Sequence, residues 1–111
     1  MIEKTILDYL DRELTPPVYM ERPESPPGKY VLVEKTGSGK HNHIYDATLA
    51  IQSYAPSMHE AAELNELVKA AMEGAVELNT ICRVGLNSDY NFTDTAMKGY
   101  RYQAVFDITH Y

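Results

Sequence analysis

The sequence has 111 residues, a formal net charge of −6 and one cysteine, Cys82. This length predicts a single domain, residues 1–111, that can bury one hydrophobic core without disulfides or metal. Lys and Arg form no cluster, which disfavours a nucleic-acid binder, and no apolar run is long enough to cross a membrane. The N-terminus lacks the apolar core of a signal peptide, so we expect the chain to remain in the cytoplasm in which it is made.

Two segments have the apolar periodicity of amphipathic helices. Apolar residues at spacings of three and four predict a helix over Ile2–Leu14, which the following Thr-Pro-Pro ends. A second helix is predicted from Ser57 to about residue 78. Ser57 and Glu60 match a capping box at its start, and Leu67 widens its apolar stripe.

Five further segments have the composition of strands, separated by proline-rich, glycine-rich or polar loops. The longest predicted loop is Asn87–Gly99, and loops of this length are often functional. The element order α-β-β-β-α-β-β predicts an α+β fold. In this fold a single, mostly antiparallel or mixed β-sheet packs against two amphipathic helices. The predicted strands are Val18–Arg22, Tyr30–Lys35, His43–Tyr54, Ile81–Leu86 and Tyr100–Tyr111.

The run T-G-S-G-K, residues 36–40, resembles part of a phosphate-binding loop. Such a loop needs a glycine at position 34 and a hydroxyl at position 41, where this chain has Glu34 and His41. The next predicted element is a strand, so no helix N-terminus would face a phosphate. We therefore predict that Thr36–Asn42 is a hairpin turn in which the glycines supply positive φ angles.

Candidate metal and nucleophile residues are isolated in the sequence. His41 and His43 could share one face of a strand, but a zinc site needs three or four ligands and no further candidate is near in sequence. Cys82 lies in an apolar run and is predicted to be a small buried residue. No catalytic constellation is present, so we expect no enzyme activity and no cofactor.

Several longer runs resemble a known family. They include V-Y-M-E-R-P, P-P-G-K-Y-V-L-V-E-K-T-G, A-T-L-A-I-Q-S-Y-A-P-S-M-H-E-A-A-E-L-N-E-L-V, L-N-S-D-Y-N-F-T-D and R-Y-Q-A-V-F-D-I-T-H. Over nearly the whole chain, the sequence resembles the tail-completion proteins of long-tailed phages and prophages. This is the tail terminator and head–tail joining group, whose members are also described as minor capsid or minor tail proteins.

The resemblance implies a structural virion protein. It would form a homohexameric ring at the head-proximal end of the tail, after assembly in the bacterial cytoplasm. Its partners would be the tail tube protein and a head completion or connector protein, and DNA would pass through the ring without specific binding. The alternatives are another head–tail connector or minor capsid adaptor, and a small ligand-binding module that uses the basic turn.

A ring subunit needs exposed loops and edges, not an active site. We expect interface residues in the hairpin at Gly37–Lys40, in the proline loop at Pro23–Gly28 and in the loop Asn87–Gly99. In the last of these, Tyr90 and Phe92 are apolar groups among polar ones. The predicted interface residues are Gly37, Lys40, His41, Asn87, Asp89, Tyr90, Phe92, Asp94 and Lys98.

Overall fold

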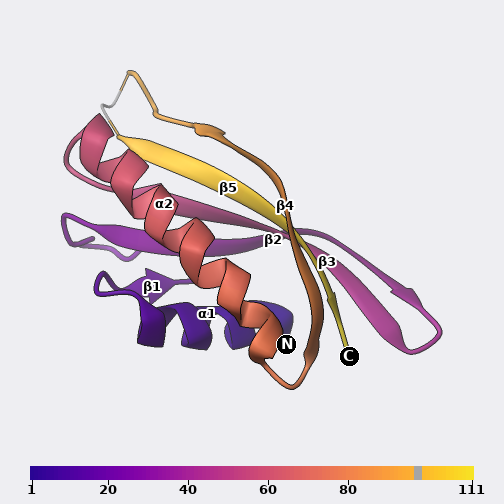
Figure 1. Ribbon diagram of the computed structural model, residues 1–111. Coiled ribbons are helices and arrows are strands. Elements are labelled where there is room, and N and C mark those ends of the chain that lie inside the picture. Colours follow the sequence, from indigo (N-terminus) through magenta and orange to yellow (C-terminus); the bar gives the residue numbers. More distant parts are fainter. Residues whose placement is uncertain (97–98) are drawn as a thin grey trace.

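The computed structural model describes residues 1–96 and 99–111 and has one mixed five-stranded sheet with two helices (Figure 1). The predicted α+β fold and element order are confirmed. The strand order is β1-β2-β3-β5-β4, in which β1 runs parallel to β2 and every other pair is antiparallel. The elements are α1 (Ile2–Glu13), β1 (Val18–Tyr19), β2 (Tyr30–His41), β3 (Ile44–Tyr54), α2 (Met58–Gly74), the 3-10 turn η1 (Ala75–Glu77), β4 (Ile81–Asn91) and β5 (Arg101–His110).

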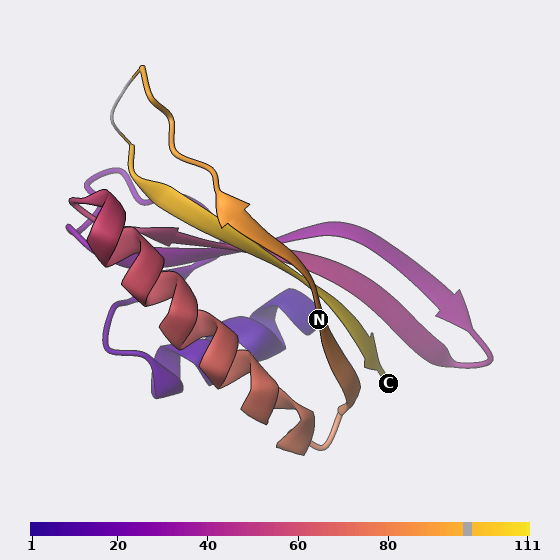
Figure 2. The ribbon, with the colours of Figure 1, turned by 45° about the horizontal axis from the view of Figure 1, so that its top comes forward.

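Both helices cover the same face of the sheet, and within residues 1–96 and 99–111 no helix covers the other face (Figure 2). The covered face forms the hydrophobic core, where buried side chains from both helices meet those of the sheet. Burial of such side chains is the main stabilising contribution to a domain of this size. Fully buried residues of this core include Ile6, Leu10, Val31, Leu49, Ile51, Val68, Met72 and Ile108.

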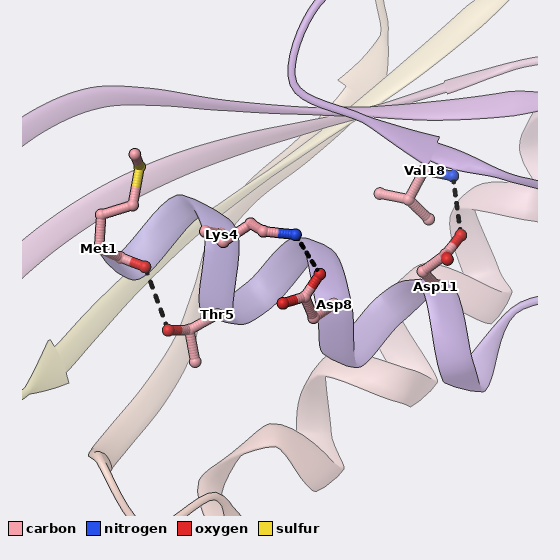
Figure 3. A network of polar contacts seen from close by, with 6 residues as sticks. All are labelled: Met1, Lys4, Thr5, Asp8, Asp11 and Val18. Atoms are coloured by element: carbon pink, nitrogen blue, oxygen red, sulfur yellow. Dashed lines mark hydrogen bonds and ion pairs between the residues drawn. The ribbon is translucent and has the colours of Figure 1, made fainter.

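Polar contacts fix α1 at its start and tie it to β1 (Figure 3). The Thr5 hydroxyl donates to the Met1 carbonyl at 3.1 Å, and Lys4 pairs with Asp8 at 2.7 Å. Near the end of the helix, the backbone N–H of Val18 donates to the Asp11 carboxylate at 3.3 Å. This last contact positions β1 directly after the turn that follows α1.

The start of α2 confirms Ser57 as the N-cap, but the predicted capping box forms only in part, because the Glu60 carboxylate bonds the Ser57 hydroxyl and not a backbone N–H. The backbone N–H of Glu60 donates to the Ser57 hydroxyl at 3.2 Å, and this hydroxyl donates to the Glu60 carboxylate at 2.9 Å. The hydrogen bond from Ser57 lowers the pKa of Glu60. The prediction for Leu67 is wrong, because its side chain is 57% exposed on the outer surface of α2.

A close contact joins the two helices at the end of α2. The Tyr9 hydroxyl donates to the Ala71 carbonyl at 2.7 Å, and burial raises the pKa of this tyrosine. A Cβ atom at Gly74 would lie only 2.7 Å from the same hydroxyl. Gly74 is therefore needed for the approach of Tyr9 and is more than a weak position in the helix.

The strands differ from the prediction mainly at their ends. β1 is only two residues long and does not reach Arg22, since the proline-rich segment follows it. β2 does not stop at Lys35, and β4 does not stop at Leu86. The predicted loop Asn87–Gly99 therefore begins too early, because residues 87–91 belong to β4 and Ser88 to Asn91 pair with β5. No helix in the described part of the chain is long and apolar enough to cross a membrane.

Candidate interaction surfaces

The predicted interface residues lie at two opposite ends of the sheet. Gly37, Lys40 and His41 belong to the far part of the β2–β3 hairpin. Asn87, Asp89 and Tyr90 belong to β4, and Phe92 and Asp94 follow that strand. Lys98 lies outside the described residues. The structure thus separates these residues into two surfaces and does not join them into one site.

The first surface is the far part of the β2–β3 hairpin, residues 34–46, which we call the arm. Every residue of the arm is exposed, and the hairpin projects to the right of the body in Figure 1. Lys40 lies 5.3 Å from the ring centroid of Tyr45, and this ring stacks on His110 of β5 with centroids 5.5 Å apart. A groove of about 560 Å³ between the arm and the start of α1 is lined by these side chains and by Met1.

The turn of the arm is not where the sequence predicted it. Gly37 and Gly39 lie inside β2, and no described glycine has a positive φ. The turn consists of Asn42 and His43, whose φ angles are 49° and 68°. A two-residue hairpin turn of type I′ requires positive φ at both central residues, and asparagine and histidine tolerate this region better than most residues. The prediction failed because it assigned the positive φ angles to the glycines.

The T-G-S-G-K run, residues 36–40, is therefore not a loop. Residues 36–40 are part of a strand, and the next element is the antiparallel strand β3. The sequence therefore lacks both the loop and the helix N-terminus that would bind a phosphate. Among residues 1–96 and 99–111, no group of three or more His, Cys, Asp or Glu side chains could hold a metal ion.

The second surface is a cluster on the uncovered face, near the end of β4. We call it the open-face cluster and define it as Gln52, Tyr54, Tyr90, Phe92, Arg101 and Gln103. Tyr90 and Phe92 are each 41% exposed, and their rings meet edge to face with centroids 5.8 Å apart. The guanidinium carbon of Arg101 lies 4.4 Å from the Phe92 ring centroid. Exposed aromatic rings combined with arginine are typical of protein–protein interfaces.

A chain of hydrogen bonds holds the open-face cluster in place. Arg101 donates from Nε to the Phe92 carbonyl at 2.7 Å and from Nη1 to the Tyr54 hydroxyl at 2.9 Å. The Tyr54 hydroxyl donates to Gln52 at 2.9 Å, and the Gln52 amide donates to Gln103 at 2.8 Å. The Gln103 amide in turn donates to the Tyr90 hydroxyl at 2.5 Å. The exposed rings are thus pre-ordered, which lowers the entropy cost of binding.

Stacked tyrosines extend the open-face cluster toward β1. The Tyr54 and Tyr30 rings are parallel within 4°, with centroids 4.5 Å apart, and Tyr19 meets Tyr30 edge to face at 6.2 Å. Burial raises the pKa of Tyr30. Aromatic side chains therefore cross the uncovered face from one edge of the sheet to the other.

Two of the predicted interface residues make contacts within the chain. Asp89 points toward α2, where Lys69 lies 3.3 Å and the Asn65 amide 3.4 Å from its carboxylate. Hydrogen bonds to Glu66 and also to Asp89 raise the pKa of Lys69. Asn87 donates to Asp107 of β5 at 2.9 Å. Both side chains therefore hold β4 to the body of the domain.

Cys82 is exposed, so the prediction that it is buried is wrong. The register between β4 and β5 shifts between Ile81 and Arg83, which places Cys82 in a β-bulge on an edge strand. A bulged residue leaves the regular alternation that the prediction assumed. A hydrogen bond with the Cys82 side chain raises the pKa of Tyr111.

The sequence analysis missed the partners that order Tyr90 and Phe92. Gln52, Tyr54 and Arg101 come from strands that are distant in sequence, and cross-strand register brings them together. One feature of the sequence could have indicated this arrangement. Tyr90 and Phe92 are two residues apart, as are side chains on the same face of an extended segment. No protein-family model matches this sequence, and no curated protein matches it either.

Proposed function

We propose that this protein is a structural subunit that forms a ring at the head-proximal end of a phage tail. The ring would end growth of the tail tube and join the tail to the head. Its partners would be further copies of itself, the tail tube protein and a head completion or connector protein. Assembly would take place in the bacterial cytoplasm, and the final location would be the virion.

The observation that carries this proposal is the open-face cluster. Tyr90 and Phe92 expose large ring surfaces, yet Arg101 and Gln103 fix their positions through hydrogen bonds. A rigid aromatic surface with arginine is the composition of residues that contribute most to binding between proteins. The resemblance of the sequence to tail-completion proteins directs this general inference to one assembly.

The arm supports the same proposal. Every residue of the arm is exposed, so the arm buries little side-chain surface within its own chain. Such an arm gains stability when it contacts another molecule, and a ring provides neighbours at a fixed distance. The negative net charge also fits a ring through which DNA passes without being bound.

The test is native mass spectrometry of the purified protein over a range of concentrations. A second run would add tail tubes that lack their terminator, taken from the phage that encodes this chain. A third run would add the purified head connector. We expect a closed ring, alone or on the tubes. A protein that stays monomeric and binds neither tubes nor connector would contradict the proposal.

The role of the open-face cluster is tested with the double variant Tyr90→Ala/Phe92→Ala. We expect binding to the tail tubes or between copies to weaken about 30-fold, which corresponds to about 2 kcal/mol for an aromatic hot spot. The matched control is Leu67→Ala/Val76→Ala, which removes two apolar side chains that are also exposed but lie outside the cluster. Circular dichroism checks that both variants fold. Equal binding by the two variants would contradict a role for the cluster.

A further inference from the structure

The outer edge of β2 has no partner strand over most of its length. β1 pairs only with Val31 and Leu32. From Val33 to His41, no described strand lies on that side, and every residue from Glu34 onward is exposed. A free edge of this length presents a row of backbone N–H and C=O groups that can pair with another strand.

The outer edge of β4 also has no partner among the described strands. This unpaired edge spans the same rows of the sheet as the unpaired edge of β2. The register runs from Val33 through Ile51 and Ala104 to Asp89, so these residues form one row across the sheet. A second row joins Lys40, Tyr45, His110 and Ile81. The two free edges therefore begin and end at the same rows. Past Asp89, the next rows are those where β1 already occupies the edge of β2.

Strand direction makes the two edges complementary. β2, β3, β5 and β4 are each antiparallel to the next, so β2 and β4 run in opposite directions at the two edges. When two copies stand side by side with their helices on the same face, β2 of one copy lies antiparallel to β4 of the next. This joint would have the same hydrogen-bond geometry as the antiparallel pairs within each copy.

The side chains of the two edges are compatible at this register. With both copies at the same height, Gly39 lies opposite Arg83, because both share the row of Asp46 and Thr109. Val33 lies opposite Asp89, and Lys40 lies opposite Ile81. No like charges face each other directly in these rows, an arrangement that would destabilise a pair of strands.

Bulges on both edge strands provide curvature. The register shifts between Lys35 and Gly37 in β2, and at two places in β4, around Cys82 and around Asn87. Bulges bend a strand and increase its twist, and closed sheets use them to turn. A sheet extended through these edges would therefore curve and could close.

We infer that a second copy of this chain binds by edge-to-edge pairing, with residues 33–41 of β2 antiparallel to residues 81–89 of β4 in the neighbouring copy. This inference rests on the proposed function, since it specifies how neighbouring subunits of the ring join. The joint is heterologous, so each copy uses one edge for each neighbour, and the row of copies closes into a ring when the rotation between neighbours divides a full turn. All helices then lie on one surface of the ring and all open-face clusters on the other.

The only natural cysteine of the chain provides a direct test, because Cys82 lies on the β4 edge. The variants Gly39→Cys and Lys40→Cys each place one thiol on the β2 edge, at the two rows between which Cys82 lies. Cα atoms of paired antiparallel strands are about 4.5–5.5 Å apart, within the range that a disulfide bridges. Mild oxidation in the presence of tail tubes should then give a ladder of covalent multimers on a denaturing gel.

Two controls separate the outcomes. The variant Glu73→Cys places the new thiol on the exposed surface of α2, and Lys40→Cys/Cys82→Ser removes the natural partner; neither should give the ladder. A ring seen by native mass spectrometry in which no β2 cysteine cross-links to Cys82 would overturn the edge pairing and leave the ring itself standing. Absence of any ring or tube binding for the unmodified protein would overturn the proposed function and this inference together.

A charge pair offers an independent test that leaves the backbone of the edge intact. A side chain at Gly39 meets no atom within 4 Å, and this glycine has no positive φ, so Gly39→Lys fits without strain. The new lysine faces Asp46 within its own chain and Arg83 of the neighbouring copy. We expect Gly39→Lys to fold normally but to raise the concentration for half-assembly several-fold. Gly39→Lys/Arg83→Glu should restore assembly, and failure to restore it would contradict the register.

Discussion

The two faces of the sheet are ordered by different interactions. On the covered face, Leu49, Ile51 and Ile108 are excluded from water by the two helices. On the uncovered face, a chain of hydrogen bonds from Arg101 to Tyr90 orders side chains of which several stay exposed. The covered face depends on packing, and the uncovered face depends on directional bonds. A surface of the second kind can be rigid and still be available to a partner.

The largest expected effect is the difference in the free energy of unfolding lost when a buried leucine and an exposed leucine are each replaced by alanine. Leu49 is fully buried on the covered face, whereas Leu86 on β4 is 50% exposed. Leu49→Ala should lower the free energy of unfolding by about 2–5 kcal/mol, because it removes buried surface and leaves a cavity. Leu86→Ala should lower it by less than about 1 kcal/mol. Urea unfolding measures both values, and a loss for Leu49→Ala as small as that for Leu86→Ala would contradict the dependence of the covered face on packing.

The next effect concerns the buried glutamine pair of the open-face cluster. Gln52 and Gln103 are each 8% exposed and are joined by a hydrogen bond of 2.8 Å. Gln103→Leu leaves the Gln52 amide without its acceptor, so we expect a loss of about 1–3 kcal/mol. The double variant Gln52→Leu/Gln103→Leu should cost less than the single one, since no buried amide is then left unpaired. Urea unfolding of the full cycle would contradict this account if the two single losses simply added.

The smallest effect tests how tightly the covered side is packed. Gly74→Ala should improve the intrinsic helix propensity by about 1 kcal/mol, yet we expect a net destabilisation of about 1 kcal/mol. The reason is that the new Cβ would lie 2.7 Å from the Tyr9 hydroxyl. In a Tyr9→Phe background this hydroxyl is absent, so the same substitution should become stabilising. Thermal unfolding of the four proteins measures the change of sign, and stabilisation in both backgrounds would contradict the contact.

The sequence was sufficient to predict the fold class and the element order. The apolar periodicity of α1 and α2 and the N-cap at Ser57 depend on neighbours within a few residues, so local rules identify them. Strand ends were less predictable. Exposed edge strands need not alternate, so the polar residues Asn87 and Ser88 gave no strand signal although they belong to β4.

The candidate surfaces were predictable only in part. Tyr90 and Phe92 were identified because apolar residues in a polar segment are conspicuous. Their hydrogen-bond partners were not, because cross-strand register between β3, β5 and β4 is a long-range property. The bulge at Cys82 and the turn at Asn42 also escaped prediction, since each depends on how the paired strand is aligned.

The alternating direction of the long strands has a consequence for growth by repetition. In a row of strands that alternate in direction, the two outermost strands run in opposite directions only when the number of strands is even. This is the case for the four long strands β2, β3, β5 and β4. With an odd number, identical units in a row would meet through parallel strands, a joint of a different kind from those inside each unit. Because the number of long strands is even, the joint between two copies would be antiparallel, like the strand pairs inside each copy. In the ring that we propose, the number of copies would depend on how strongly the sheet of each copy bends.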